Sequence, residues 1–555
     1  MKTLNIYRLL LMAFATIFIT FSLPFAAMAD AGAADAFVDE NATGVGDCSS
    51  WADACTDLQS ALEVASDLDG DGDVEIWIAT GTYKPSVTYT VSGVLRGACG
   101  IDGSCFASDD VAMQTFNLTE VAGALDAPRK EVRLYGGFDG TERSLGEREV
   151  EDQPRFTLSD GSRFKDGGSH VFANETILSG DIGVIGDNAD NVWHVITLSD
   201  DVALKGINVT LDGLTVQEGN ANGPGDVFAG TLPYDHKSAG GIYSFLAAGA
   251  TVHTGLTLSD ITVRDNVGAE RGGGLRYKDF FEESGSGGVI VLDSSFINNT
   301  VADKSSALRF HGADLSISNS VFKDNTSVLG SGALAPLLGG TGSIRDNLFV
   351  NNISGGLGGA LASAALGGLG SDGELLVQNN TFDSNSASRG GGAILYVGTV
   401  PTGRTETVGN IFLNNSGGTL GGGAVIIIRS GIFTFTDNTF QDNSSLGAGG
   451  AIIARAAGPN GPPDEVIIIG DHFTDNIAGG NGGGLSFGDG VEAALCKVKA
   501  KGNEAGGSGG GLYAAGAGTI VNIAKSKFKK NEPDNIDDDD TATLTFFKKC
   551  EDLPS

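Results

Sequence analysis

Hydrophobic residues recur along this chain in short runs that are separated by glycine and asparagine, and the runs keep a common phase. A Phe-x-x-Asn motif occurs eight times in this phase, and two weaker copies end at Asn266 and Asn503. From Asn266 onward, successive motif asparagines lie 26 to 33 residues apart. Self-similarity at such a period is typical of stacked repeats. The eight full copies are Phe296/Asn299, Phe322/Asn325, Phe349/Asn352, Phe382/Asn385, Phe412/Asn415, Phe440/Asn443, Phe473/Asn476 and Phe528/Asn531.

A second motif follows each internal asparagine, and its aliphatic residue lies nine or ten residues after the asparagine. It consists of small residues and then an aliphatic residue, as in 391–394 (GGAI) and 483–485 (GGL). No helical period separates these runs, so we expect short strands joined by turns. One further Phe-x-x-Asn match, Phe435/Asn438, falls out of phase, and we interpret it as coincidence.

Stacking such units places each strand next to its own copy, ~4.8 Å away. We expect the motif phenylalanines to point inward and stack. We expect the motif asparagines to adopt the left-handed turn conformation and to bond to their copies above and below. Glycine leaves room where coils crowd at a corner. The pattern therefore predicts an all-β fold, a single right-handed parallel β-helix (solenoid) of about eleven coils with an N-terminal capping helix.

The first residues match a secretory signal peptide. Lys2 and Arg8 supply positive charge, residues 9–25 are apolar, and residues 27–29 (AMA) fit the cleavage pattern. We therefore predict a signal peptide over residues 1–29 and a protein that is secreted or associated with the outer-membrane surface. No later stretch is apolar over the ~20 residues that a membrane-spanning helix needs.

Three regions follow the predicted signal peptide. Residues 30–130 are predicted to form an N-terminal cap with a short helix and the first strands, and the capping box 56–59 (TDLQ) begins that amphipathic helix. Residues 131–531 are predicted to form the β-helix repeats. Residues 532–555, which include four consecutive aspartates, are predicted to form an acidic C-terminal tail or cap.

The six cysteines are predicted to form disulfides, because an exported protein meets an oxidising environment. Six cysteines allow 15 connectivities. Short local loops favour Cys48–Cys55 and Cys99–Cys105, which leaves Cys496–Cys550 to hold the C-terminus.

The charge balance excludes some partners. The formal net charge is −34. A nucleic-acid-binding protein needs a basic stripe that displaces counterions. We find no such stripe in the sequence and predict no nucleic-acid partner. An anionic membrane surface would also repel an acidic chain.

An aspartate-rich segment resembles the start of a calcium-binding loop. Asp67, Asp69, Asp71 and Asp73 alternate with Leu and Gly residues, and carboxylates in this pattern suit a hard cation. Ile78 stands where the closing glutamate of such a loop would lie. The segment is therefore either a calcium site, the one cofactor that the sequence suggests, or an acidic turn between helix and strand. Asp181, Asp187, Asn188 and Asp190 form a second, weaker cluster.

Long insertions fall mostly in one phase of the repeat, at 277–288, 362–373, 398–406 and 456–465. Insertions at one phase of a solenoid gather along one edge of the rod. We predict a binding edge there that exposes Tyr277, Phe280, Phe281 and Arg404. The alternative is a set of tolerated surface loops.

The paired motifs resemble the polymorphic outer membrane protein repeats, and the resemblance extends over roughly residues 37 to 531. Shared segments near the N-terminus are 49–54 (SSWADA), 76–79 (IWIA), 81–85 (GTYKP), 134–138 (LYGGF), 140–142 (GTE) and 178–183 (LSGDIG). The resemblance implies an exported bacterial right-handed β-helix with a role in adhesion.

Members of that family end in a membrane β-barrel. No comparable run of alternating segments follows residue 531. We therefore expect release from the cell, or anchoring by a partner.

Residues that would carry catalysis do not recur in phase. The histidines are scattered, and we interpret Asp293, Asn319, Asp346, Asn379 and Asp437 as turn formers. We therefore predict a non-catalytic adhesion or binding scaffold whose partner is a host or neighbouring cell-surface protein or polysaccharide. The alternative is a polysaccharide lyase or glycoside hydrolase on the same fold, because fold alone does not determine function.

Overall fold

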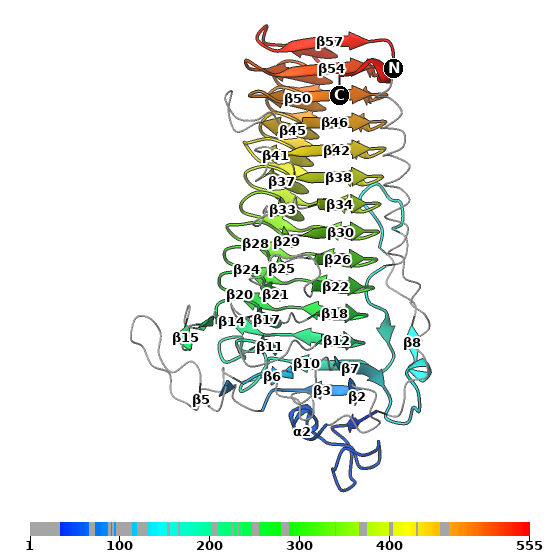
Figure 1. Cartoon of the computed structure of the whole chain (residues 1–555), viewed down its shortest axis with the longest axis vertical. Coiled ribbons are helices and arrows are strands. Elements are labelled where there is room, and N and C mark those ends of the chain that lie inside the picture. Colours follow the sequence, from blue (N-terminus) through cyan, green and yellow to red (C-terminus); the bar gives the residue numbers. More distant parts are fainter. Residues whose placement is uncertain are drawn as a thin grey trace.

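The protein is a rod of stacked coils in the computed structural model, with its first and last coils at opposite ends (Figure 1). Most coils contribute one strand to each of four sheets, which we number 1 to 4 in chain order. The structure describes residues 34–65, 73–86, 90–91, 94–95, 114–118, 131–151, 156–164, 167–200, 208–223, 227–229, 232–234, 236–246, 255–278, 288–312, 314–338, 340–365, 374–398, 403–428, 431–455 and 465–554.

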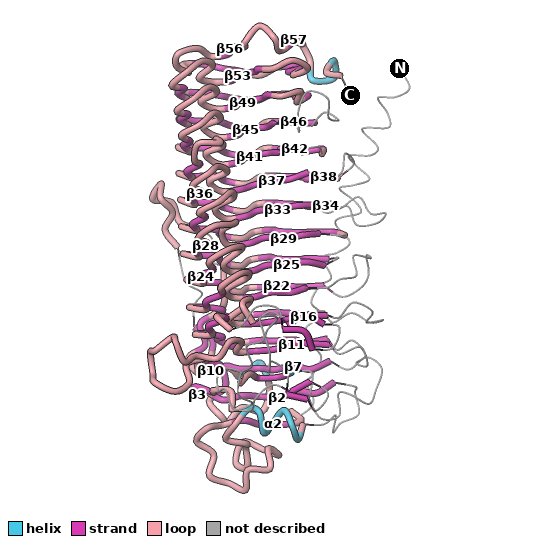
Figure 2. Tube along the Cα trace, turned by 90° about the vertical axis from the view of Figure 1, so that its left-hand side faces the viewer, coloured by secondary structure: helices cyan, strands magenta, loops and turns pink. Residues whose placement is uncertain are grey.

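The four sheets are parallel throughout, which confirms the predicted all-β parallel β-helix. Sheet 1 has fifteen strands, sheets 2 and 4 have thirteen each, and sheet 3 has ten. A representative coil passes through β34 (Glu374–Gln378), β35 (Thr381–Asp383), β36 (Ser386–Ala387) and β37 (Ile394–Gly398), in sheets 1 to 4. Figure 2 shows these rungs from the side, with the turns stacked along one corner.

Sheets 1 and 2 carry the features discussed below. Besides β34, sheet 1 contains β1 (Ala36–Val38), β2 (Asp73–Ala79), β7 (Glu131–Phe138), β12 (Asn208–Asp212), β18 (Leu256–Ser259), β22 (Gly288–Leu292), β26 (Asp314–Ser318), β30 (Thr341–Arg345), β38 (Arg404–Val408), β42 (Ile432–Thr436), β46 (Glu465–Ile469), β50 (Glu492–Cys496), β54 (Ile520–Ala524) and β57 (Thr543–Phe547). Besides β35, sheet 2 contains β3 (Gly81–Tyr83), β10 (Thr176–Ser179), β13 (Leu214–Gln217), β19 (Thr262–Arg264), β23 (Ser295–Ile297), β27 (Val321–Lys323), β31 (Leu348–Val350), β39 (Ile411–Leu413), β43 (Thr439–Gln441), β47 (His472–Thr474), β51 (Lys499–Lys501) and β55 (Lys527–Lys529).

The motif phenylalanines form an internal stack, as predicted. Seven of them, from Phe296 to Phe473, follow one another with ring centroids 4.5 to 4.9 Å apart and planes within 10°. Each of the seven is fully buried. Ala500 interrupts the stack before Phe528. The strand spacing sets the ring spacing, because equivalent residues on neighbouring rungs are paired in register.

The motif asparagines form a buried ladder, which confirms their predicted bonding to the copies above and below. The backbone N–H and the Nδ2 of Asn385 both donate to Oδ1 of Asn415, at 3.0 Å each. The same Nδ2 donates to the carbonyl oxygen of Phe349 at 2.9 Å. All eight motif asparagines are buried, and Asn531 donates to Asn535, four residues further along the chain. The other seven donate to the next rung as Asn385 does: Asn299, Asn325, Asn352, Asn385, Asn415, Asn443 and Asn476. The weaker copy Asn503 continues the ladder between Asn476 and Asn531, and Asn535 accepts the last bond.

The prediction that the motif asparagines adopt the left-handed conformation is wrong, because that conformation occurs one residue earlier. Positive φ occurs at none of Asn299, Asn325, Asn352, Asn385, Asn415, Asn443, Asn476 and Asn531. It belongs to the residue before each of them: Asn298, Asp324, Asn351, Ser384, Asn414, Asp442, Asp475 and Lys530, with φ from 51° to 58°. The preceding residue makes the turn because the asparagine must direct both its backbone N–H and its side chain at the next rung.

A second buried ladder lies five residues before the first, and the sequence interpretation missed it. Asn347, Asn380, Asn410 and Asn438 donate in turn to the next copy. The last acceptor is Asp471. The match at Phe435/Asn438 is therefore not coincidence, because Asn438 is a member of this ladder.

Small residues are required where the turn into sheet 4 packs against its copies. A Cβ atom added to Gly332 would lie 1.5 Å from the carbonyl oxygen of Gly359, and one added to Gly359 would lie 2.0 Å from that of Gly392. The following aliphatic residue, such as Ile394, is fully buried. The small-residue motif thus marks the tightest corner of the rod.

The N-terminal end is closed by the predicted capping helix, α2 (Leu58–Val64), which packs on β1 and β2. Leu58, Ala61 and Leu62 are fully buried. The N-cap is Asp57 rather than the predicted Thr56: its side chain accepts from the backbone N–H of Ser60 at 3.0 Å. In the described part of the chain, no helix combines the length and the apolar character needed to cross a membrane.

The parallel pairing extends beyond residues 131–531, the region predicted for the β-helix repeats. The segments β1 and β2 already pair in parallel with the rest of sheet 1. Beyond residue 531, β56 (Ile536–Asp538) pairs with β53 (Leu512–Ala515), and β57 pairs with β54. The aspartate-rich tail is therefore part of a further coil. These end coils lack the Phe-x-x-Asn motif, which is why about eleven coils were predicted where sheet 1 has fifteen strands.

Two of the three predicted disulfides are present. Cys48 pairs with Cys55 near the capped end, and Cys496 pairs with Cys550 across 54 residues. The second bond joins the end of β50 to the short 3-10 helix η5 (Cys550–Asp552). Cys99 and Cys105 lie outside the described residues, as does the predicted signal peptide.

Candidate functional site

The predicted binding edge is only partly in view. Arg404 is exposed at the start of β38. Tyr277, however, is fully buried, and its ring stacks on Phe310 with centroids 5.4 Å apart. The prediction of an exposed Tyr277 was wrong because the strand alternates: Leu275 begins β21 (Leu275–Lys278) facing inward, so the residue two places later faces inward too. Phe280 and Phe281 lie outside the described residues.

Three of the predicted calcium ligands, Asp67, Asp69 and Asp71, lie outside the described residues. The fourth, Asp73, lies in β2, where its carboxylate pairs with the Arg133 guanidinium at 2.7 Å. In the weaker cluster, Asp181 and Asp190 accept backbone N–H bonds from their own loop, as turn-forming residues do. Among the residues that the structure describes, no group of three His, Cys, Asp or Glu side chains could hold a metal ion.

The most distinctive surface feature is a group of lysines at the C-terminal end of sheet 2. Residues 497–530 contain seven lysines and one acidic residue, Glu504, in a chain whose net charge is −34. All seven lysines are exposed. We call this group the lysine face, and it consists of Lys497, Lys499, Lys501, Lys525, Lys527, Lys529 and Lys530.

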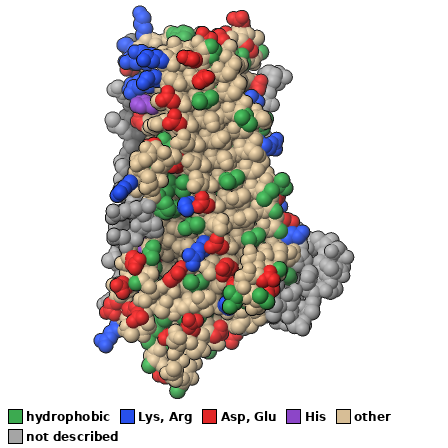
Figure 3. Space-filling view, turned by 180° about the vertical axis from the view of Figure 1, so that it is seen from behind, with side chains coloured by type: hydrophobic (Ala, Val, Ile, Leu, Met, Phe, Trp, Pro, Cys, Tyr) green, Lys and Arg blue, Asp and Glu red, His purple; other side chains and the backbone are tan. Residues whose placement is uncertain are grey.

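Strand alternation and register arrange the lysine face. In β51, Lys499 and Lys501 point outward on either side of the buried Ala500. The next strand, β55, repeats this pattern, and Lys499 pairs with Lys527 while Lys501 pairs with Lys529. Neighbouring lysines thus lie ~6.6 Å apart along a strand and ~4.8 Å apart between strands. Figure 3 shows basic side chains gathered at one side of this end of the rod, whereas acidic ones are scattered over the whole view.

Three of the lysines occupy turns that other coils fill with different residues. At the turn from sheet 1 to sheet 2, the left-handed position in the preceding coils is Gly213, Asp260, Asp293, Asn319, Asp346, Asn379, Gly409, Asp437 and Gly470. In the last two coils it is Lys497 (φ 58°) and Lys525 (φ 50°). Lys530 (φ 56°) holds the matching position at the next turn. The left-handed conformation is unfavourable for a residue with a long side chain, so the sequence accepts local strain where it places these charges.

The lysines have few partners within the described residues. None of the seven makes a salt bridge there. The Lys499 Nζ lies 2.9 Å from Nε2 of His472, the outward residue on the preceding strand. Burial, and then the positive charge of Lys499, lowers the pKa of His472 below its ordinary value. A neutral imidazole can accept a hydrogen bond from the ammonium group, so His472 adds no competing positive charge at neutral pH.

A segment from the N-terminal part of the chain covers the middle of the same sheet. We call residues 156–164 and 167–170 the strap, which Figure 1 draws in cyan as it climbs beside the rod from β8 (Val150–Glu151). The Ser159 N–H donates to Asp383 Oδ2 at 2.7 Å, and Asn414 Nδ2 donates to Ser159 Oγ at 2.7 Å. Leu158 and two partly buried phenylalanines pack on outward residues of β27, β31 and β39: Val321, Leu348, Val350 and Leu413.

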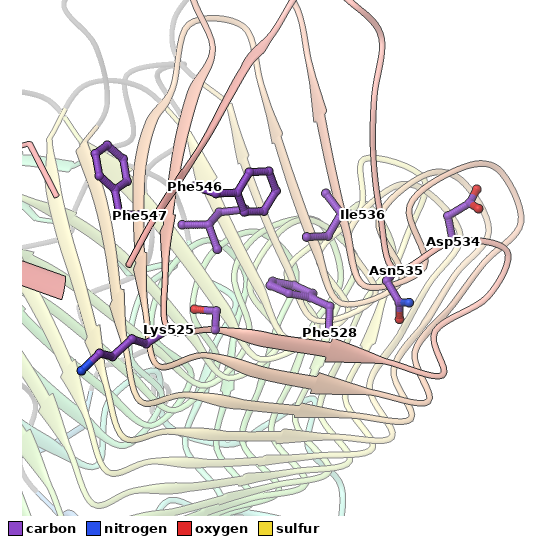
Figure 4. Close-up of a pocket in the computed structure, with 9 residues that line it drawn as sticks. Lys525, Phe528, Asp534, Asn535, Ile536, Phe546 and Phe547 are labelled. Carbon is purple, nitrogen blue, oxygen red and sulfur yellow. The ribbon is translucent and has the colours of Figure 1, made fainter. Parts of the chain in front are cut away.

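A hollow of about 550 Å³ opens at the C-terminal end of the core (Figure 4). Its lining includes Phe528, Ile536 and Phe546, and the last of these is 65% exposed. Lys525 lies on its rim and belongs to the lysine face as well. Unlike the N-terminal end, which α2 closes, this end leaves the last inward side chains partly open to solvent.

The disulfide to Cys496 brings two more lysines near the lysine face. Cys496 precedes Lys497, and Cys550 follows the exposed Lys548 and Lys549. The two cysteine Cα atoms are 5.5 Å apart. The C-terminal segment is therefore fixed with its charges close to the corner of sheets 1 and 2.

The sequence interpretation missed the lysine face, although a signal was present. The segments 497–501 (KVKAK) and 525–529 (KSKFK) place lysine at every second residue in two successive repeats. This alternation marks the outward face of a strand. The chain as a whole is acidic, and the sequence interpretation therefore found no basic stripe. The lysine face is a basic part of the surface that it overlooked.

Known proteins give no guide to the role of this face. No protein-family model, curated protein or solved structure matches the chain.

Proposed function

We propose that this protein is an exported, non-catalytic binding scaffold that holds an anionic partner on the lysine face. The observation that supports this most directly is the in-register array of exposed lysines on β51 and β55. Adhesion, the role implied by the resemblance to the polymorphic outer membrane protein repeats, agrees with this proposal.

The surrounding negative charge makes the lysine face selective. Screening limits charge interactions to about 8 Å at physiological ionic strength. A partner that contacts the lysines therefore gains local attraction, whereas contact with most other surfaces of this acidic chain meets repulsion. Exposed lysines supply positive charge and hydrogen-bond donors. These groups suit the binding of an anion, and we assign them no role in a chemical reaction.

Binding of the full mature chain to immobilised anionic and neutral polymers tests the proposal. We expect retention on the anionic polymer only, with release at high salt. A variant with Lys499, Lys501, Lys527 and Lys529 changed to Gln should lose retention. A matched variant, in which the exposed Arg143, Arg163, Lys304 and Arg389 are changed to Gln, has the same net charge and should keep it.

Two results would overturn the proposal. Equal loss of retention in both variants would assign the binding to overall charge rather than to the lysine face. New reducing ends or unsaturated products from an acidic polysaccharide would favour a polysaccharide-degrading enzyme instead.

A further inference from the structure

We infer that the partner is a linear acidic polysaccharide, with a carboxylate or sulfate on its sugars, which lies along strands β51 and β55. This inference rests on the proposed function and specifies its ligand. It depends on three features: the width of the surface that attracts an anion, the spacing of the lysine charges and the side chains that face the ligand.

The favourable surface is narrow. Among the described strands of sheet 2, the last two rungs carry outward lysines in pairs, whereas Lys323 of β27 stands alone and pairs with Asp324 at 2.7 Å. One or two rungs earlier, the turns that flank the sheet expose Asp437, Asp442 and Asp475. A flat bilayer or a wide duplex laid on the lysines would also come close to these carboxylates. A thin chain that runs along the strands, across the rod, avoids them.

The charge spacing matches a polymer with moderate charge density. Within each strand two ammonium groups, on Lys499 and Lys501 or on Lys527 and Lys529, lie at an interval of ~6.6 Å. A third, on Lys497 or Lys525, stands at the turn before the strand. Duplex DNA carries one charge per ~1.7 Å of its axis, which is several times denser. A polysaccharide that is charged at each sugar spaces its anions on the scale of a sugar ring, close to the lysine interval.

The side chains of the face also favour a polysaccharide over single-stranded nucleic acid. Proteins that bind single strands stack the bases on exposed aromatic rings. The aromatic residue of β55, Phe528, lies between the two lysines on the inward side of the strand and packs against the core. The outward residues of the last three strands of sheet 2 are lysines, His472 and Thr474.

The strained lysines extend each row to the edge of the sheet. Lys497 and Lys525 prolong the rows at the turn from sheet 1, and Lys530 stands at the opposite turn. Lys548 and Lys549, fixed by the Cys496–Cys550 bond, lie beyond the first of these turns. The bound chain would therefore meet positive charge over the full width of sheet 2 and around one corner.

Titration calorimetry with a graded series of oligogalacturonates tests the inference on the full mature chain. Affinity should rise with oligomer length until the rows are spanned and should then level off. The variant with Lys499, Lys501, Lys527 and Lys529 changed to Gln should bind the longest oligomer at least about tenfold more weakly, which corresponds to about 1.4 kcal/mol. The Arg143, Arg163, Lys304 and Arg389 variant should bind as the natural chain does. Circular dichroism should show both variants folded.

Two further probes at the same salt concentration separate the possible outcomes. If vesicles of phosphatidylserine or a single-stranded oligonucleotide bind more tightly than the longest oligogalacturonate, the polysaccharide inference is wrong while the proposed function stands. If no anionic probe binds in a lysine-dependent way, both fail. An affinity that keeps rising with length, well beyond the width of sheet 2, would contradict binding along the strands.

Discussion

Two regions of sheet 2 have the same backbone and almost the same interior, yet their outer faces differ completely. In the middle of the rod, the outward positions of β27, β31 and β39 are mostly apolar and lie under the strap. In the last two coils, the equivalent positions are exposed lysines. The inward residues change less, because buried phenylalanines stack from Phe296 to Phe473. In the last two coils the inward residues are Ala500, which interrupts the stack, and the partly buried Phe528.

The comparison separates residues that maintain the fold from residues that are available for binding. Inward positions must repeat, because each side chain packs on its copy in the neighbouring coil. Outward positions are not restricted in this way. In the middle of sheet 2 they bind the protein's own strap, and at the end they present a regular charge to the surroundings.

The largest expected effect tests whether the interior is the same in both regions. Phe382 is the inward residue of β35, in the region that the strap covers, and Phe473 is the inward residue of the strand next to the lysine face. Both rings are fully buried, and the variants to compare are Phe382→Ala and Phe473→Ala. Each substitution should lower the free energy of unfolding by about 4 kcal/mol through lost burial and a cavity. Denaturant unfolding of the two variants measures this. A much smaller loss for Phe473→Ala would show that the coils of the lysine face are packed differently from the rest.

The strap should matter in one region only. Leu158→Ala removes a buried contact with the apolar outer face and should cost about 2 to 3 kcal/mol. Hydrogen exchange should accelerate in β27, β31, β35 and β39 and stay unchanged in β51 and β55. Faster exchange in the last two strands would mean that the strap stabilises the whole sheet, and the contrast between the regions would be lost.

The boundary between the regions contains a buried acid that should make stability depend on pH. Burial raises the pKa of Asp471, the last acceptor of the second ladder, well above its ordinary value. A raised folded pKa means that stability is highest below the unfolded pKa and is lost as pH rises through the folded one. Asp471→Asn should remove this loss and stabilise the protein by about 1 to 2 kcal/mol at neutral pH.

The earlier members of that ladder explain why Asp471→Asn should stabilise the protein rather than destabilise it. The Asn438 Nδ2 donates to the carbonyl oxygen of Thr407, and Asn410 donates in the same way to Val377. By the same repeat, the amide introduced at residue 471 would face the carbonyl oxygen of Phe435. Melting temperatures of both proteins from acid to neutral pH test this. A pH dependence that persists in Asp471→Asn would assign the effect to another group.

The smallest effect concerns the strained turns of the lysine face. Lys497→Gly and Lys525→Gly relieve an unfavourable left-handed conformation, so each should raise the free energy of unfolding by about 0.5 to 1 kcal/mol. Each should also weaken binding of an acidic polymer. Lys304 is exposed but does not have a positive φ. Lys304→Gly is therefore the control variant, and it should not stabilise the protein. Tighter binding by the Lys497→Gly variant would contradict the role assigned to this residue.

Much of the fold was predictable because stacking repeats the same physical requirement in every coil. Phe382 and Asn385 meet their copies above and below, so each must recur in phase, and the recurrence is visible in the sequence. The end coils were not predictable from the motif. There, β1 and β57 each have a neighbour on one side only in sheet 1, and they do not carry the repeated residues.

The candidate site was harder to predict for two reasons. The strap joins Ser159 to Asp383 across 224 residues, and no repeat announces a contact of this kind. The lysine face was hidden by the net charge, which averages over the whole chain. Tyr277 shows the opposite error, in which an aromatic residue near an insertion was predicted to be exposed although strand alternation directs it inward.

Lysine acetylation in the presence of a bound acidic polysaccharide tests the central claim most directly. With long polygalacturonate bound, Lys497, Lys499, Lys501, Lys525, Lys527 and Lys529 should be protected from an acetylating reagent, as mass spectrometry of the peptides would show. Lys304, which is exposed far from this face, should react at the same rate with and without the polymer. Protection spread evenly over all exposed lysines, or absent from residues 497–529, would contradict the assignment of this face as the binding site.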